Sequence, residues 1–154
     1  MPSERIKEYA FLLLKYRLRS ESELYQRLKR KKFSDGEIKE LLFFLKDRKF
    51  IDDKVFVKSW INSRLGRSFG LKRISQELKI KGVPKDLLEE AIEQAKKGYC
   101  ESRVIEELAR DRLARLKDVE SDKARNRIYA YLLRRGFSPE IVIDTLNKIC
   151  KQMH

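Results

Sequence analysis

The sequence is poor in the residues from which catalytic and metal-binding sites are usually built. Of its 154 residues, one is histidine and two are cysteine. The histidine is His154, the last residue, and chain ends are usually poorly ordered. The sequence also contains no Gly-rich phosphate loop and no His/Glu helix motif. We therefore expect a protein that is not an enzyme, with no cofactor and no metal site.

The two cysteines, Cys100 and Cys150, do not form a metal-spaced pair. A disulfide framework would need more of them. They are either apolar core residues or an incidental pair.

Glycine, proline and long apolar runs are also scarce. With six glycines and three prolines, the sequence has no Gly/Ser/Pro-rich linker between independently folding domains. The N-terminal segment MPSERIKEYAFLLLKYRLR has an apolar stretch that is too short, and too closely flanked by charge, for a spanning helix or a secretory signal. We read it as the first packed helix of a soluble, cytoplasmic protein that has no membrane partner.

What the sequence does have is an apolar repeat of about fifty residues. The segments 24–45, 74–95 and 128–149 align without gaps. Repeats of this length are typical of stacked helical units, each of which buries its apolar face against the next. All eighteen aligned positions are apolar: Leu24/Ile74/Ile128, Leu28/Leu78/Leu132, Phe33/Val83/Phe137, Ile38/Leu88/Val142, Leu42/Ile92/Leu146 and Leu45/Ala95/Ile149.

Within each unit the apolar spacing of i, i+3, i+4, i+7 predicts helices and no strands. The ranges we expect are 4–18, 21–31, 35–49, 53–66, 71–81, 84–97, 101–117, 122–135 and 139–152. The predicted fold is all-α, with three-helix repeats at 1–52, 53–98 and 99–154 in an elongated stack.

The helix ends are marked by local signals. SESE at 20–23 and SDGE at 34–37 are capping boxes. Gly82 and Gly136 stand where a helix ends in the left-handed conformation. The first repeat has Lys32 at this point, where a side chain costs about 1 kcal/mol, so we expect its turn to differ.

The charge balance indicates an anionic partner. The formal net charge is +13, and it is spread over the three repeats as +5, +5 and +3. A basic surface of this kind favours non-specific binding to nucleic acid, single- or double-stranded, or to a protein with an acidic groove. The alternative is a highly charged, solvated helical surface.

Basic residues concentrate in the second helix of each repeat, where they either contact phosphate or an acidic groove or remain solvated near a helix C-terminus. We expect the contacts to come from this set: Arg27, Lys29, Arg30, Lys31, Lys32, Lys72, Arg73, Lys79, Lys81, Arg125, Arg127, Arg134 and Arg135.

Four other residues allow two interpretations each. Trp60 is a core residue with its N–H at the surface, or it stacks on a base. Phe43 lies opposite the apolar stripe of its helix, where it packs against a neighbouring repeat or is presented to a partner. Asp52 and Asp53 are the one pair of adjacent aspartates; a helix cap explains them more simply than a metal site does.

Two segments carry the most specific motifs. Residues 50–64 read FIDDKVFVKSWINSR, an acidic helix start followed by an aromatic-bearing helix. Residues 70–83 read GLKRISQELKIKGV. Together with SESELYQRLKRKKF at 20–33 and LLRRGFS at 132–138, their order and spacing resemble those of the RecX family, bacterial regulators of the RecA recombinase. The resemblance extends over nearly the whole chain.

This resemblance implies tandem three-helix repeats in a curved rod, here a monomer. The rod would bind in the groove of the RecA–DNA filament and restrain its ATPase and strand exchange. A stand-alone DNA-binding regulator is the alternative, with the second helix of a repeat as a recognition helix. Against it, these helices carry scattered Lys and Arg, which suit phosphates better than base edges.

Overall fold

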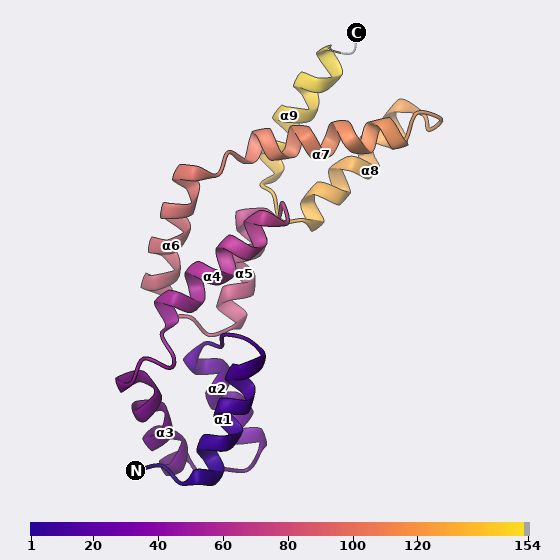
Figure 1. The fold of residues 1–154 in the computed structure, drawn as a ribbon. Coiled ribbons are helices and arrows are strands. Elements are labelled where there is room, and N and C mark those ends of the chain that lie inside the picture. The colour runs from indigo at the N-terminus through magenta and orange to yellow at the C-terminus, as the bar shows by residue number, and fades with distance from the viewer. Residues whose placement is uncertain (153–154) are drawn as a thin grey trace. The chain divides into compact units, whose positions relative to one another are not determined.

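The computed structural model describes residues 1–152, and every regular element in this range is an α-helix (Figure 1). The all-α class is confirmed, and each predicted helix end lies within two residues of the observed one. The helices of this range are α1 Glu4–Tyr16, α2 Glu21–Arg30, α3 Asp35–Asp47, α4 Asp53–Gly66, α5 Leu71–Ile80, α6 Lys85–Gly98, α7 Glu101–Arg115, α8 Ser121–Arg134 and α9 Pro139–Gln152.

The repeated apolar positions form the core, as predicted. Sixteen of the eighteen are buried. The exceptions are Ile92 and Ala95, both half-buried. Leu28, Leu78 and Leu132, the aligned positions near the end of the second helices, are all 0 % exposed. Burial of the same positions in all three repeats follows from their shared spacing, which places them on one face of each helix.

The chain forms two compact units, and the second repeat contributes residues to both. One unit holds Met1–Trp60 and Glu77–Ala91. Its main cluster draws on α1, α2 and α3, with Ile6, Leu24 and Leu41 fully buried. The other unit holds Ile61–Gln76 and the chain from Ile92 onward. Its cluster draws on α7, α8 and α9 around Ile105 and Leu132.

The capping boxes at Ser20 and Ser34 are both formed. Ser20 accepts a hydrogen bond from the Glu23 N–H at 3.1 Å, and the Glu23 carboxylate accepts from the Ser20 N–H at 3.2 Å. Ser34 and Glu37 make the same reciprocal pair. Two free amide groups at the start of each helix are thereby satisfied.

The turn after each second helix has the same conformation in all three repeats, so the expectation that the first turn differs is wrong. Lys32 has φ +75°, Gly82 +75° and Gly136 +94°. In each turn the second residue beyond the cap donates to the carbonyl five residues earlier, as Phe33 does to Leu28 at 3.3 Å. This is the Schellman arrangement.

Glycine occurs in the later two turns because these turns lie against the repeat before. A Cβ at Gly82 would overlap the side chain of Ser22, and one at Gly136 would overlap Arg73, whose Cα lies 2.9 Å away. Lys32 belongs to the first repeat of the chain and is exposed. A side chain at this position therefore brings the strain of the left-handed backbone but no clash with another repeat.

Candidate functional site

The predicted basic residues fall into two groups, those that bind other parts of the chain and those that face solvent. Five of the thirteen have partners within the chain: Lys29, Arg73, Lys81, Arg125 and Arg135. Six are exposed, and their side chains have no such partner among the described residues: Arg30, Lys32, Lys72, Lys79, Arg127 and Arg134. The remaining two, Arg27 and Lys31, are described below.

Lys81 joins the second repeat to the first. Its Nζ lies 3.1 Å from the Glu23 carboxylate and 4.8 Å from the centre of the Trp60 ring. Its backbone carbonyl accepts a hydrogen bond of 2.6 Å from the Ser20 hydroxyl. Lys81 therefore has a structural role between the two repeats, and its filament contact stays a prediction.

Trp60 is half-buried and packs within the fold, in line with the core interpretation. Its ring stacks on Phe56 at 5.9 Å, and its Nε1 donates to Glu77 at 3.2 Å. Phe43 does not pack against a neighbouring repeat as one interpretation held, because it is 71 % exposed.

Arg73 and Arg135 are also structural, gathered around Phe69. Both guanidinium carbons lie 4.2 Å from the centre of that ring. Arg73 donates to the carbonyl of Arg134 at 3.1 Å, and Arg135 donates to that of Ser68 at 3.1 Å. These contacts tie the loop after α4 to the turn after α8.

Tyr99 adds a hydrogen bond to the same loop. Its hydroxyl donates to the Phe69 carbonyl at 2.9 Å. Burial, with the charge of Glu101 adding to it, raises the pKa of Tyr99 to about 12, so the hydroxyl remains a donor over the whole physiological range.

A first basic cleft, of about 240 Å³, lies beside α2. Arg27 and Arg30 line it together with Arg17 and Arg19. Burial, followed by the charges of Arg17 and Arg27, lowers the pKa of Arg19. Glu23 also lines the cleft and partly balances this charge through Arg17. Lys31 lies outside it, 5.5 Å from the Tyr9 ring.

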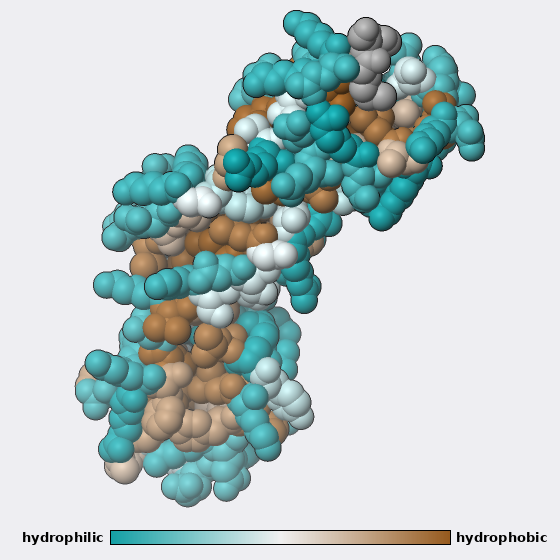
Figure 2. All heavy atoms as spheres, turned by 45° about the horizontal axis from the view of Figure 1, so that its top comes forward, coloured by the Kyte–Doolittle hydropathy of each residue, from teal (hydrophilic) through white to brown (hydrophobic). Residues whose placement is uncertain are grey.

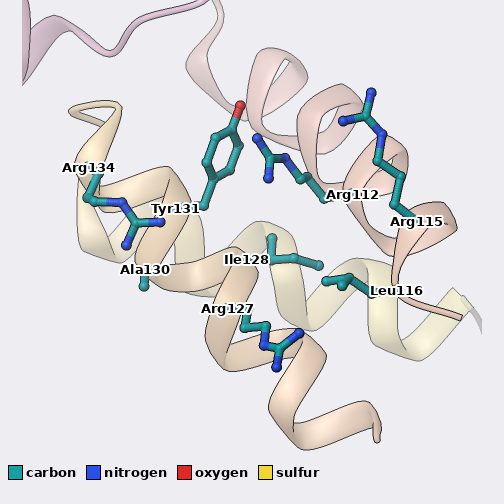
Figure 3. Close-up of a pocket in the computed structure, with 8 residues that line it drawn as sticks. All are labelled: Arg112, Arg115, Leu116, Arg127, Ile128, Ala130, Tyr131 and Arg134. Carbon is teal, nitrogen blue, oxygen red and sulfur yellow. The ribbon is translucent and has the colours of Figure 1, made fainter. Parts of the chain in front are cut away.

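A second basic cleft, of about 390 Å³, lies between α7 and α8 (Figure 3). Arg112 and Arg115 come from α7, and Arg127 and Arg134 come from α8. The guanidinium of Arg112 lies 3.7 Å from the centre of the Tyr131 ring. Between these groups the wall is apolar, and no carboxylate lines the cleft. Its apolar lining residues are Leu116, Ile128 and Ala130.

The sequence identified only part of this cleft. Arg127 and Arg134 were predicted as contacts, whereas Arg112, Arg115 and Tyr131 were missed. One signal was present, because Arg127, Tyr131 and Arg134 have the i, i+4, i+7 spacing of a single helix face. Nothing in the sequence indicated that the end of α7 would lie beside that face.

The described residues show no metal site, since no three of their His, Cys, Asp and Glu side chains are placed to hold an ion. His154 lies outside the described residues. Cys100 is exposed and Cys150 half-buried, and both are free thiols. None of the described helices is long and apolar enough to cross a membrane.

Comparison with known proteins identifies the family. Three domain models match in order: the first three-helix domain of RecX at 7–45, the second at 52–92 and the third at 101–146. "Regulatory protein RecX" of Thermotoga petrophila is 37 % identical over 144 residues, which cover 92 % of this chain and 82 % of that protein. The protein of the same name from Haemophilus influenzae (strain PittGG) is 30 % identical over 91 % of both chains. The chain belongs to the RecX family.

Solved structures agree on the fold. The crystal structure of RecX from Lactobacillus salivarius superposes with a TM-score of 0.77 and covers 94 % of each chain. Its sequence identity is 24 %, so this likeness supports the fold alone. The second cleft lies within the residues that match the third RecX domain.

Proposed function

We propose that this RecX-family chain is a non-enzymatic, cytoplasmic regulator that binds the RecA recombinase–DNA filament as a monomer and restrains its ATPase and strand exchange. The observation that carries the proposal is the presence of three RecX domains, in order, over most of the chain. The family's regulatory name agrees with a binding role.

The exposed basic residues support a surface made of contributions from several repeats. Arg30 comes from the first repeat, Lys72 and Lys79 from the second, and Arg127 and Arg134 from the third. Several weak contacts on one chain act together, so the whole binds far more tightly than any single repeat. Arg73, Lys81 and Arg135 are left out of this surface because they stabilise the fold.

The test is a filament ATPase assay with the intact chain and the recombinase of the same species. We expect inhibition by the wild type. Three charge-reversed variants should each inhibit less while keeping a helical circular dichroism spectrum: Arg30→Glu with Lys31→Glu, Lys72→Glu with Lys79→Glu, and Arg127→Glu with Arg134→Glu.

The matched control reverses two exposed lysines outside this surface, Lys97 and Lys148. Lys97→Glu with Lys148→Glu changes the net charge equally and should inhibit nearly as well as the wild type. If a folded wild-type preparation in several-fold excess leaves ATPase and strand exchange unchanged, the proposed function is wrong.

A further inference from the structure

The second cleft lies where, in the earlier repeats, a following repeat packs. In the first repeat Glu23 of α2 pairs with Lys81 from the turn of the second. In the second repeat the aligned residue, Arg73 of α5, donates to the carbonyl of Arg134, the last residue of α8 in the third repeat. The third member of this alignment is Arg127. It is exposed, and no turn covers it within residues 1–152. The third repeat therefore leaves exposed the position that the next repeat contacts in the other two.

Among the described residues, only one of the four arginines of this face has an ion-pair partner. Arg115 pairs at 3.2 Å with Asp111, itself exposed. No ion pair forms at the side chains of Arg112, Arg127 or Arg134 among the described residues. Like charges held near one another repel unless an anion lies between them. Guanidinium groups bind phosphate through paired N–H donors, which favours a phosphate-bearing ligand.

The spacing along α8 adds a flat apolar surface between two of these charges. Arg127 and Arg134 are seven residues apart, so their Cα atoms are separated by roughly 10 Å along the helix axis. Tyr131 lies between them on the same face and is half-buried, with Arg112 stacked against its ring (Figure 3). Bases stack on aromatic rings and on arginine planes alike.

We propose that this cleft holds a segment of single-stranded nucleic acid, with one base against the Tyr131–Arg112 pair and the flanking phosphates on Arg127 and Arg134. This inference rests on the proposed function, which takes DNA as a partner. It adds where on the chain the DNA binds and that the bound DNA is single-stranded. A volume of about 390 Å³ suits one nucleotide unit, because pockets for small ligands begin at about 300 Å³.

An acidic peptide is the competing occupant, and the two ligands use different parts of the cleft. Carboxylates would engage the arginines and gain nothing from the Tyr131 ring. A nucleotide engages the charges, the aromatic ring and the apolar wall of Leu116 and Ile128 together. The base is therefore the feature that a test must isolate.

The experiment measures binding of the intact chain, without recombinase, to two labelled strands of equal length and charge. One is a thymidine oligonucleotide and the other is its abasic counterpart. We expect the wild type to bind the base-bearing strand about tenfold more tightly, the usual contribution of one stacked base. Tyr131→Leu keeps apolar volume and should abolish this preference while leaving the affinity for the abasic strand unchanged.

Arg127→Ala with Arg134→Ala should weaken the binding of both strands. The slope of log K against log salt concentration should become about 1.4 less steep, because two phosphate contacts to a single strand are lost. The control, Lys97→Ala with Lys148→Ala, removes the same charge elsewhere and should keep the tenfold preference. Melting curves followed by circular dichroism establish that each variant is folded.

Three outcomes would overturn the proposal. These are equal affinity for the two strands, a base preference that survives Tyr131→Leu, or tighter binding of a polyglutamate peptide or of ATP alone than of the oligonucleotide. If the wild type shows no base preference but still inhibits the filament, this site alone is contradicted. A base preference that depends on the cleft in a chain that does not inhibit the filament contradicts the proposed function alone.

Discussion

At the scale of single residues, Glu23 makes the densest set of polar contacts in the first unit. It accepts hydrogen bonds from Arg17, from the Ser20 N–H and from Lys81. Its side chain is 15 % exposed. Burial raises the pKa of Glu23, but these three donors outweigh it and hold the pKa below its ordinary 4.5. One carboxylate thus connects the end of α1, the start of α2 and the turn after α5.

Glu23→Gln should lower the free energy of unfolding by about 1–2 kcal/mol at pH 7, because hydrogen bonds to a charged acceptor are lost. A lowered folded pKa stabilises the protein above pH 4.5, and this contribution disappears as the pH falls through the folded pKa. Urea unfolding of both proteins at pH 7 and below pH 4 should therefore show a difference that shrinks in acid. Glu90→Gln, at an exposed carboxylate of the same unit, is the control and should shift stability little at either pH.

The glycine turns give a second prediction at this scale. Gly136→Ala should destabilise the protein by more than about 2 kcal/mol, since it adds left-handed strain and a clash with Arg73. Lys32→Gly should stabilise it by up to about 1 kcal/mol, because the same strain is removed where nothing crowds the turn. Thermal and urea unfolding of the two variants measures both changes. Equal effects of opposite sign would mean that the clash contributes nothing.

At the scale of the helix, two second helices are capped by carboxylates from the next repeat. The Glu21 N–H in the first turn of α2 donates to Asp53 at 2.9 Å, and the Leu71 N–H of α5 donates to Glu101 at 2.8 Å. Asp53 was expected to cap its own helix. Asp52 does so instead, accepting from the Lys54 N–H at 2.9 Å. Burial raises the pKa of Asp53, and the negative charges of Glu21 and Asp52 raise it further. The hydrogen bond from the Glu21 N–H acts in the opposite direction.

Glu101→Ala should therefore weaken α5 more than its own helix, α7. We expect a loss of about 1 kcal/mol, the usual effect of a missing helix cap. Native-state hydrogen exchange should show the change as faster exchange in the first turn of α5. Ser102→Ala, at the adjacent exposed residue, is the control. An effect confined to the first turn of α7 would show that Glu101 acts only on its own helix.

At the scale of the whole molecule, charge is distributed over all three repeats rather than collected in a tail. A surface of this kind binds phosphates without reading sequence. On the face shown in Figure 2, hydrophilic residues cover most of the surface, and apolar atoms are visible between them, most of all in the lowest part. Figure 2 is turned by 45° about the horizontal axis from Figure 1, in which the first repeat lies lowest. Phe43 and Phe50 of this repeat are exposed.

We expect weak DNA binding that falls steeply with salt as counterion release is suppressed. Duplexes of different sequence should bind with similar affinity. The affinity for single strands should lie within about tenfold of that for duplex, because the stacked base strengthens single-strand binding. Fluorescence anisotropy over a salt series measures this. A strong preference for one short duplex that persists at high salt would instead favour the sequence-specific DNA-binding regulator.

The sequence by itself determined the helices, their ends and the core of this protein. Helix periodicity and capping depend on residues within a few positions of one another, so Leu28, Leu78 and Leu132 could be assigned to the core by spacing alone. The family resemblance was also available, because it rests on the order of motifs along the chain.

Only the tertiary structure decided which polar residues are structural and which remain exposed. Lys81 and Arg127 are both basic residues of a second helix or the turn after it, yet one pairs with Glu23 and the other is exposed. The sequence does not show this difference, because it depends on whether another repeat packs against that face. For the same physical reason, the Glu21 N–H of α2 is bound by Asp53, 32 residues away, and one wall of the third-repeat cleft comes from the end of α7.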